Sequence, residues 1–256
     1  MPEQYLYVMG AESGAGKSTV CLGILAQLLS DGYAPSELAY IKPMTQCTDR
    51  QAVTIFCEQQ TIEHRDAALI FRKGFTRDFI DGLTPDSAAL KNGILQKIAD
   101  VGANKKIVLI DGIGDPATGS IIGVSNASLA KAFSARVIFV SRPGLGAAID
   151  NTVLCVSFIN SHGLDNVGLI INNLPLDGVA QNKAYLSKRL ADLLPASTVL
   201  GAIRDDFKWD KKLTAEAVNQ WFSTYVKSGV LIDWMGLTPG ISELSKPMAA
   251  IPGLNF

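Results

Sequence analysis

Residues 5–19 read YLYVMGAESGAGKST, and this stretch decides the fold. The apolar run at 5–9 predicts a buried strand, a glycine-rich turn follows, and an apolar-periodic helix begins at Lys17. A strand, a turn that closes in Gly-Lys-Ser-Thr and a helix are together typical of a phosphate-binding loop of the Walker A kind. The opening glycine of that pattern is replaced by Ala11, with Gly10 just before it. The alternative is a glycine-rich turn with a surface lysine, which the strand-turn-helix context disfavours.

Each part of this loop offers a group suited to a nucleoside triphosphate. Backbone N–H groups of the turn and of the helix N-terminus can bind phosphate oxygens. Lys17 can reach the terminal phosphates as a point charge, and the Ser18 hydroxyl can coordinate Mg²⁺. The predicted nucleotide contacts in the loop are Ser13, Gly14, Ala15, Gly16, Lys17, Ser18 and Thr19. The loop therefore predicts a nucleoside triphosphate and Mg²⁺ as ligands, and the family resemblance given below implies that the nucleotide is ATP.

The composition narrows the class of protein. A chain of 256 residues that is 48% apolar allows one large domain or two small ones with a sizeable core. Its 23 basic residues nearly balance its 24 acidic ones, which argues against nucleic acid or an anionic membrane as the main partner. We expect no signal peptide and no membrane span. The four cysteines lack metal-ligand spacing, so we predict a reducing compartment, the cytoplasm or an organelle matrix.

Strands and helices alternate through most of the chain. The predicted strands span residues 5–9, 38–42, 107–111, 137–141, 167–172 and 198–202. The predicted helices span residues 17–30, 52–59, 66–71, 88–101, 125–133, 145–162, 179–193 and 213–227. Continuous apolar runs are typical of parallel strands that are covered on both faces. We therefore predict an α/β fold of the P-loop NTPase type, with a mostly parallel sheet and helices on both faces.

Two regions depart from this alternation. Residues 44–85 form a long polar excursion, and the alternation stops after residue 204. We predict a nucleotide-binding domain over residues 1–205 and a C-terminal extension over 206–256, packed on the same domain or at an oligomer interface. The excursion carries a basic cluster of Arg72, Lys73 and Arg77. This cluster could bind an anionic substrate, although the sequence alone favours a solvated face.

Four further residues have candidate roles. Asp111 ends an apolar strand as a Walker B acid does and could hold Mg²⁺, unless it only caps the next turn. Glu12 lies in the phosphate loop, where a carboxylate is costly unless Mg²⁺ or a lysine intervenes or it points to solvent. Lys42, at a strand end, could bind an anionic substrate or the transferring phosphoryl group, or be solvated. Asn172 could pair with a purine edge, although Asn is also a common turn former.

Five stretches carry a family resemblance, and they occur in the order that the family has. They are GAESGAGKST at 10–19, IKPMTQ at 41–46, IDGIGD at 110–115, GLGAAIDNTVLCVSFINSHGL at 144–164 and VGLIINN at 167–173. Over roughly residues 4–204 the chain resembles dethiobiotin synthetase. That family belongs to a larger group of P-loop proteins, with cobyrinic acid amide synthases and the amino-terminal domain of long phosphotransacetylases.

The resemblance implies a reaction. In dethiobiotin synthetases an amine of diaminopelargonate captures CO2 as a carbamate, ATP phosphorylates the carbamate, and the second amine closes the ureido ring. The resemblance implies that Lys17, Lys42 and Glu12 are catalytic, with Lys42 steadying the carbamate and the transferring phosphoryl group. It also implies a homodimer, since family members commonly pair.

The resemblance assigns the binding residues too. Ser18, Asp111 and Glu12 would hold the metal, because Glu12 and Asp111 match positions of metal-binding acids in the family. Asn172 would read adenine.

Several positions depart from the family pattern. Gln46 and Cys47 stand where the family has a small hydroxyl residue and Gly, and Gln51 stands where it has a further metal-binding acid, with Asp49 slightly early. A lysine-proline pair followed by Gln46 is more similar to the phosphotransacetylase domain. Three functions therefore stay open. They are a dethiobiotin synthetase-type ligase, a relative that activates another carboxylate or carbamate, and a non-catalytic nucleotide-sensing module.

Overall fold

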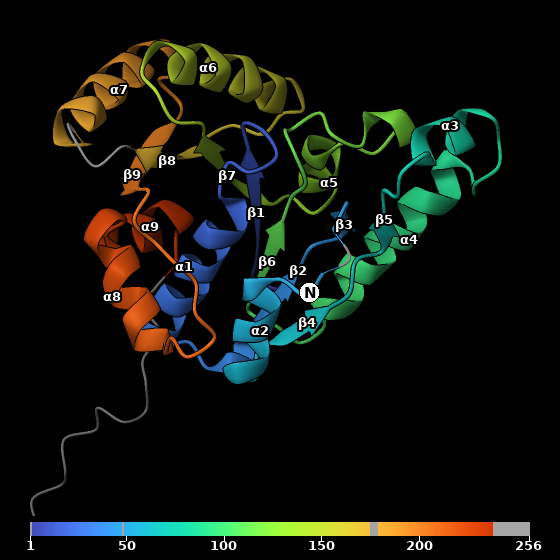
Figure 1. Ribbon diagram of the computed structural model, residues 1–256, viewed down its shortest axis with the longest axis horizontal. Helices are drawn as coiled ribbons and strands as arrows, with labels where there is room; N and C mark the ends of the chain where they lie inside the picture. Colours follow the sequence, from blue (N-terminus) through green and yellow to red (C-terminus); the bar gives the residue numbers. More distant parts are fainter. Residues whose placement is uncertain (1, 48, 175–178, 238–256) are drawn as a thin grey trace, which may run out of the picture.

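The computed structural model describes residues 2–47, 49–174 and 179–237, and a seven-stranded sheet forms its centre (Figure 1). The strand order is β4-β2-β6-β1-β7-β8-β9, and every neighbouring pair is parallel. These strands are β1 (Gln4–Gly10), β2 (Leu38–Ile41), β4 (Glu63–Arg65), β6 (Ile107–Asp111), β7 (Arg136–Ser141), β8 (Gly168–Leu174) and β9 (Thr198–Arg204). The predicted α/β class and the six predicted strands are confirmed; β4 was not predicted.

Helices cover both faces of this sheet, which explains why its strands are apolar throughout. In β1, Leu6 and Val8 pack into the core on one face, and Tyr7 and Met9 pack into the core on the other. The first face is covered by α1 (Lys17–Ser30), α2 (Ala52–Gln59), α8 (Ala215–Tyr225) and α9 (Ser228–Met235). The second face is covered by α4 (Ser87–Val101), α5 (Asn126–Ala132), α6 (Gly146–Ser161) and α7 (Val179–Leu193).

The polar excursion contains a small second sheet. Strand β3 (Met44–Thr45) pairs in parallel with β5 (Leu69–Ile70), and the six-residue helix α3 (Phe75–Ile80) follows. The predicted helix over residues 66–71 is therefore wrong. The backbone N–H groups of Leu69 and Phe71 donate to Pro43 and Thr45, so pairing with a distant segment replaces the local helix.

The segment after β9 packs on α1. Phe222 of α8 is fully buried, and a Cβ at Gly23 of α1 would lie 2.1 Å from its ring, so the glycine admits the aromatic side chain. Residues 238–256 of the predicted extension lie outside the described residues. Within the described part of the chain, no helix combines the length and apolar character needed to cross a bilayer.

The strand order decides which strand ends meet. Strand β6 lies between β2 and β1, with Ile110 beside Ile41 and Asp111 beside Val8. The residues that follow these parallel strands therefore gather at one edge of the sheet, where open α/β folds bind ligands.

Candidate functional site

The phosphate loop joins β1 to α1 in a form that needs its glycines. Gly14 and Gly16 have φ angles of 84° and 89°, which L side chains rarely adopt. A Cβ at Gly16 would also lie 2.0 Å from the side-chain nitrogen of Asn172. Ala11 is absent from the described residues with positive φ, and its N–H donates to Val140. The replacement of the opening glycine is therefore compatible with the loop.

Lys17 folds back over this loop. Its Nζ donates to the backbone oxygen of Glu12 at 2.9 Å, and the residue is only 6% exposed. Burial lowers the pKa of its ammonium group, while the nearby Asp111 carboxylate acts in the opposite direction. A phosphate group bound at the loop would favour the charged form.

A cavity of about 280 Å³ lies beside the loop. The loop residues that line it are Ser13, Gly14, Gly16, Lys17, Ser18 and Thr19. The other lining residues are Lys42, Thr45, Gln46, Cys47, Gln51 and the segment 112–114. Ala15 is buried and does not line the cavity. The structure thus brings the other predicted phosphate-loop residues together with Lys42, which directly follows β2.

Asp111 is the centre of the polar contacts at this site. The carboxylate is fully buried, and its Oδ2 accepts hydrogen bonds from Ser18 at 2.7 Å, Tyr40 at 3.0 Å and Lys42 at 3.1 Å. Its Oδ1 is buried with no hydrogen-bond partner among the described residues. The predicted Walker A serine and Walker B acid are thus in direct contact.

Tyr40 is a site residue that the sequence reasoning missed. Burial, and then the neighbouring Asp111 carboxylate, raise the pKa of its hydroxyl well above the ordinary value. Tyr40 therefore stays a hydrogen-bond donor to Asp111. Its position two residues before Lys42, on the same face of the strand, was the available signal.

Lys42 contacts three polar side chains of the site. Besides Asp111, its Nζ donates to Ser18 Oγ and to Gln51 Oε1, each at 3.3 Å. Gln51, which takes the place of an acid in the family pattern, therefore reaches the site as a neutral amide. Asp49 lines a neighbouring cavity together with Lys42.

Glu12 lies in the phosphate loop but does not line the cavity, and its side chain is half exposed. Its carboxylate is 3.7 Å from the guanidinium of Arg142, which directly follows β7. Arg142 was not predicted as a site residue, although an arginine directly after a parallel strand could have been recognised. The structure places Glu12 beside this cation, and Asp111 beside Ser18 and Lys42.

Asn172 is buried in β8 and connects that strand to the phosphate loop. Its Nδ2 donates to the backbone oxygen of Ala15 at 2.8 Å. The side chain therefore braces the loop from the adjacent strand, next to the predicted nucleotide contacts.

The oxygen atoms at this site can be compared with the ligands that Mg²⁺ prefers in proteins. The described residues contain no group of three or more His, Cys, Asp or Glu side chains that could hold a metal. Mg²⁺ is often bound by one or two carboxylates together with substrate phosphates and water. The unpartnered Oδ1 of Asp111 and the adjacent Ser18 hydroxyl are oxygen donors of this kind.

The chain is similar to several known proteins. A curated relative, the ATP-dependent dethiobiotin synthetase BioD of Caldicellulosiruptor saccharolyticus, is 26% identical over an alignment of 182 residues that covers 65% of this chain and 72% of that protein. Among solved structures, the MinD cell division protein of Aquifex aeolicus matches with a TM-score of 0.51 and 15% identity, over 91% of this chain and 95% of its own. The MinC:MinD complex of the same organism gives a TM-score of 0.51 and 14% identity, over 91% and 94%. These structures show the fold.

A family profile covers most of the chain. The AAA_26 family, described as an AAA domain, matches residues 4–211, from the first strand to just beyond the last. This range includes the phosphate loop, Lys42, Asp111 and Asn172. The chain therefore belongs to the AAA_26 family, the dethiobiotin synthetase-like group of P-loop proteins.

Proposed function

We propose that the protein is a Mg-ATP-dependent ligase of the dethiobiotin synthetase type. The observation that carries this proposal is the position of Lys42, whose Nζ lies 3.1 Å from Asp111 and 3.3 Å from Ser18. Lys17 already provides a cation at the phosphate loop. A second lysine, directly after β2, supplies positive charge where an acceptor would meet the terminal phosphate. Such a charge is suited to group transfer, which depends mainly on positioning and electrostatic stabilisation.

The proposed reaction has three steps. One amine of diaminopelargonate adds to CO2 and loses a proton, which gives a carbamate. A carbamate oxygen attacks the γ-phosphorus of ATP, the bond to the β-phosphate oxygen breaks, and ADP leaves. The second amine then attacks the carbamate carbon, inorganic phosphate leaves with the C–O bond electrons, and the amine proton is lost as the ureido ring closes.

The chain's own residues would act on charge and position in these steps. Backbone N–H groups of the loop and the Lys17 ammonium group would hold the phosphates. Lys42 would orient the carbamate oxygen and stabilise the charge of the transferring group. Ser18 and Asp111 would hold Mg²⁺, which when bound neutralises charge on the phosphates, and the Glu12 carboxylate is proposed as a further contributor. Asn172 is proposed to contact adenine.

A second candidate is a non-catalytic nucleotide-sensing module. The observation in its favour is Gln51, whose neutral amide contacts Lys42 where the family pattern has an acid. A site with one acid fewer could bind nucleotide without supporting turnover. A relative that activates another carboxylate or carbamate would use the same residues with a different acceptor.

ADP release separates these candidates. We would measure it with Mg-ATP, in the presence and absence of diaminopelargonate and bicarbonate. The ligase proposal predicts substrate-dependent release in the wild type and its loss in Lys17→Ala. Tight ATP binding without stimulation would reject the ligase and favour the sensing module or another acceptor.

We also propose a homodimer in the cytoplasm. The dimer is proposed from the resemblance to dethiobiotin synthetases, whose members commonly pair. The four cysteines form no disulfide, which suits a reducing compartment. Sedimentation that shows only monomer at micromolar concentration would contradict the dimer.

A further inference from the structure

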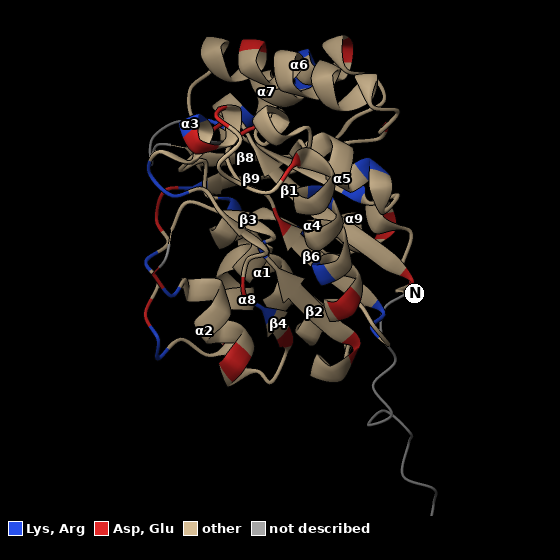
Figure 2. Ribbon diagram, turned by 90° about the vertical axis from the view of Figure 1, so that its right-hand side faces the viewer, with Lys and Arg blue, Asp and Glu red and all other residues tan. Residues whose placement is uncertain are grey.

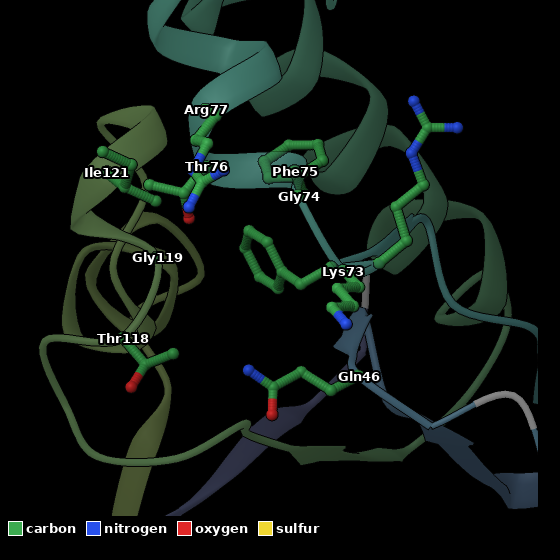
Figure 3. Close-up of a pocket in the computed structure, with 11 residues that line it drawn as sticks. Gln46, Lys73, Gly74, Phe75, Thr76, Arg77, Thr118, Gly119 and Ile121 are labelled. Atoms are coloured by element: carbon green, nitrogen blue, oxygen red, sulfur yellow. The ribbon is translucent and has the colours of Figure 1, made fainter.

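A second cavity opens beside the phosphate site, and its volume is about 510 Å³ (Figure 3). One wall is the segment 71–77, which runs from β5 into α3, and the other is the segment 118–121. The side chain of Gln46 lies at the end shown at the bottom of Figure 3 and also lines the phosphate cavity. The two cavities are therefore neighbours that share this residue.

The charged side chains that line the second cavity are all basic. Arg72, Lys73 and Arg77 line it, and no aspartate or glutamate does. Arg72 is neutralised by Asp78 at 3.3 Å. Lys73 and Arg77 form no ion pair with any other described residue. In Figure 2 basic segments lie at and beside α3. Two positive charges thus remain available to an anion.

The same cavity has an apolar part. Phe71 and Phe75 meet edge to face, with ring centroids 5.1 Å apart, and Phe75 is nearly buried. Ile121, which is 41% exposed, lies across the cavity from Phe75 (Figure 3). An isolated phosphate ion would leave this apolar surface uncovered, whereas an anion with a hydrocarbon chain would cover it.

Both walls are hydrogen-bonded to segments that follow Lys42 and Asp111 in the chain. The N–H of Phe71 donates to Thr45, three residues after Lys42, through the pairing of β3 with β5. Thr118 is held by Asp115, whose Oδ1 accepts from both the N–H and the hydroxyl of Thr118, in the loop that follows Asp111. The basic wall thus has a defined position relative to Lys42 and Asp111.

We infer that this cavity binds the acceptor substrate, and that the acceptor is an amphipathic anion. This inference rests on the proposed function. The anionic group, a carboxylate or a phosphate monoester, lies between Lys73 and Arg77, and the hydrocarbon chain packs on Phe71 and Ile121. The reactive end passes Gln46 and reaches Lys42 at the phosphate site. The basic cluster of the excursion is thus a recognition element.

Binding of simple probes tests this inference without turnover. Titrations of the full chain would measure the affinity of nonanoate, nonyl phosphate and the neutral nonanamide. Affinity should fall at least tenfold for the preferred anion in Lys73→Gln/Arg77→Gln, because both unpaired cations are removed. The matched control, Lys188→Gln/Arg189→Gln on α7, removes the same charges elsewhere and should change it less than twofold. ATP affinity should stay within twofold in both variants.

Each outcome has a defined meaning. The anion that binds more tightly identifies the acceptor as a carboxylate or a phosphate ester. Equal binding of nonanamide and nonanoate, unchanged anion affinity in the Lys73/Arg77 variant, or no saturable binding of either anion would overturn the inference. Nonanoate binding that depends on Lys73 and Arg77, without ADP release from diaminopelargonate, would reject the proposed reaction and leave this cavity as an anion site.

Discussion

Lys42→Met is the most informative change at the site. Methionine keeps a flexible apolar stem and removes the ammonium group that lies 3.1 Å from the buried Asp111 carboxylate. At this separation and an effective dielectric constant of roughly 20, the attraction between the two charges is about 5 kcal/mol. Most of it is offset by the cost of removing both charges from water. Measured hydrogen bonds to charged groups contribute about 1.5–3 kcal/mol, and we expect this loss of folding free energy.

The loss of stability should stay within that range because Asp111 keeps its hydrogen bonds from Ser18 and Tyr40. The effect on turnover should be larger than the effect on ATP affinity. Removal of one preorganised donor to developing charge costs about 10²–10³ in kcat, and Lys42 is proposed to act on the transferring phosphoryl group.

Three measurements check this prediction. Denaturant unfolding gives the stability, an ATP titration gives the affinity, and ADP release with diaminopelargonate and bicarbonate gives kcat. Lys91→Met, at an exposed position of α4, is the matched control and should resemble wild type in all three. A Lys42→Met enzyme that is folded and turns over within threefold of wild type would refute the assigned role of Lys42.

Three further predictions concern the core, the loop and pH. Phe222→Ala should lower the free energy of unfolding by about 3–5 kcal/mol in denaturant titrations because it leaves a cavity against Gly23, whereas Tyr185→Ala, at a residue 53% exposed, should change it by less than about 0.5 kcal/mol; equal effects would contradict the packing described. Gly16→Ala should weaken ATP binding at least tenfold in calorimetry, since its φ is 89° and Asn172 blocks the added Cβ, while Gly229→Ala, which meets no atom within 4 Å, should leave it unchanged. ATP affinity should fall as pH rises through the pKa of Lys17, which burial lowers below the ordinary 10.5, and Lys17→Arg should abolish this fall; an identical pH profile in both proteins would exclude Lys17 as its cause.

The sequence predicted correctly those helices and strands whose formation depends on a pattern within a few neighbouring residues. The helices at 17–30, 52–59 and 179–193 have the bounds predicted, and the six strands differ from their predictions by at most two residues at either end. Helical periodicity, continuous apolar runs and glycine-rich turns are all contained within a few neighbouring residues. Strand β4 at the sheet edge was missed because it is only three residues long and polar.

Contacts between distant segments could not be predicted in this way. Residues 66–71 have a helical pattern, yet Leu69 and Ile70 pair with Met44 and Thr45, which are more than twenty residues away. The ion pair of Glu12 and Arg142 joins the segments that follow β1 and β7, which are neighbours in the central sheet. No spacing rule in the sequence relates these two residues. The same holds for the basic wall at 71–77, which the sequence alone left as a solvated surface.

By itself, the sequence determined the phosphate loop, the α/β class and the polar residues at the strand ends, because side-chain chemistry and backbone preference act over short stretches. Only the tertiary structure decided which of those residues meet. The insertion of β6 between β2 and β1 brings Asp111 into contact with both Ser18 and Lys42, which are 93 and 69 positions away in the chain. Strand order is set by the burial of whole sheet faces and by long crossover connections, and these are properties of the complete chain.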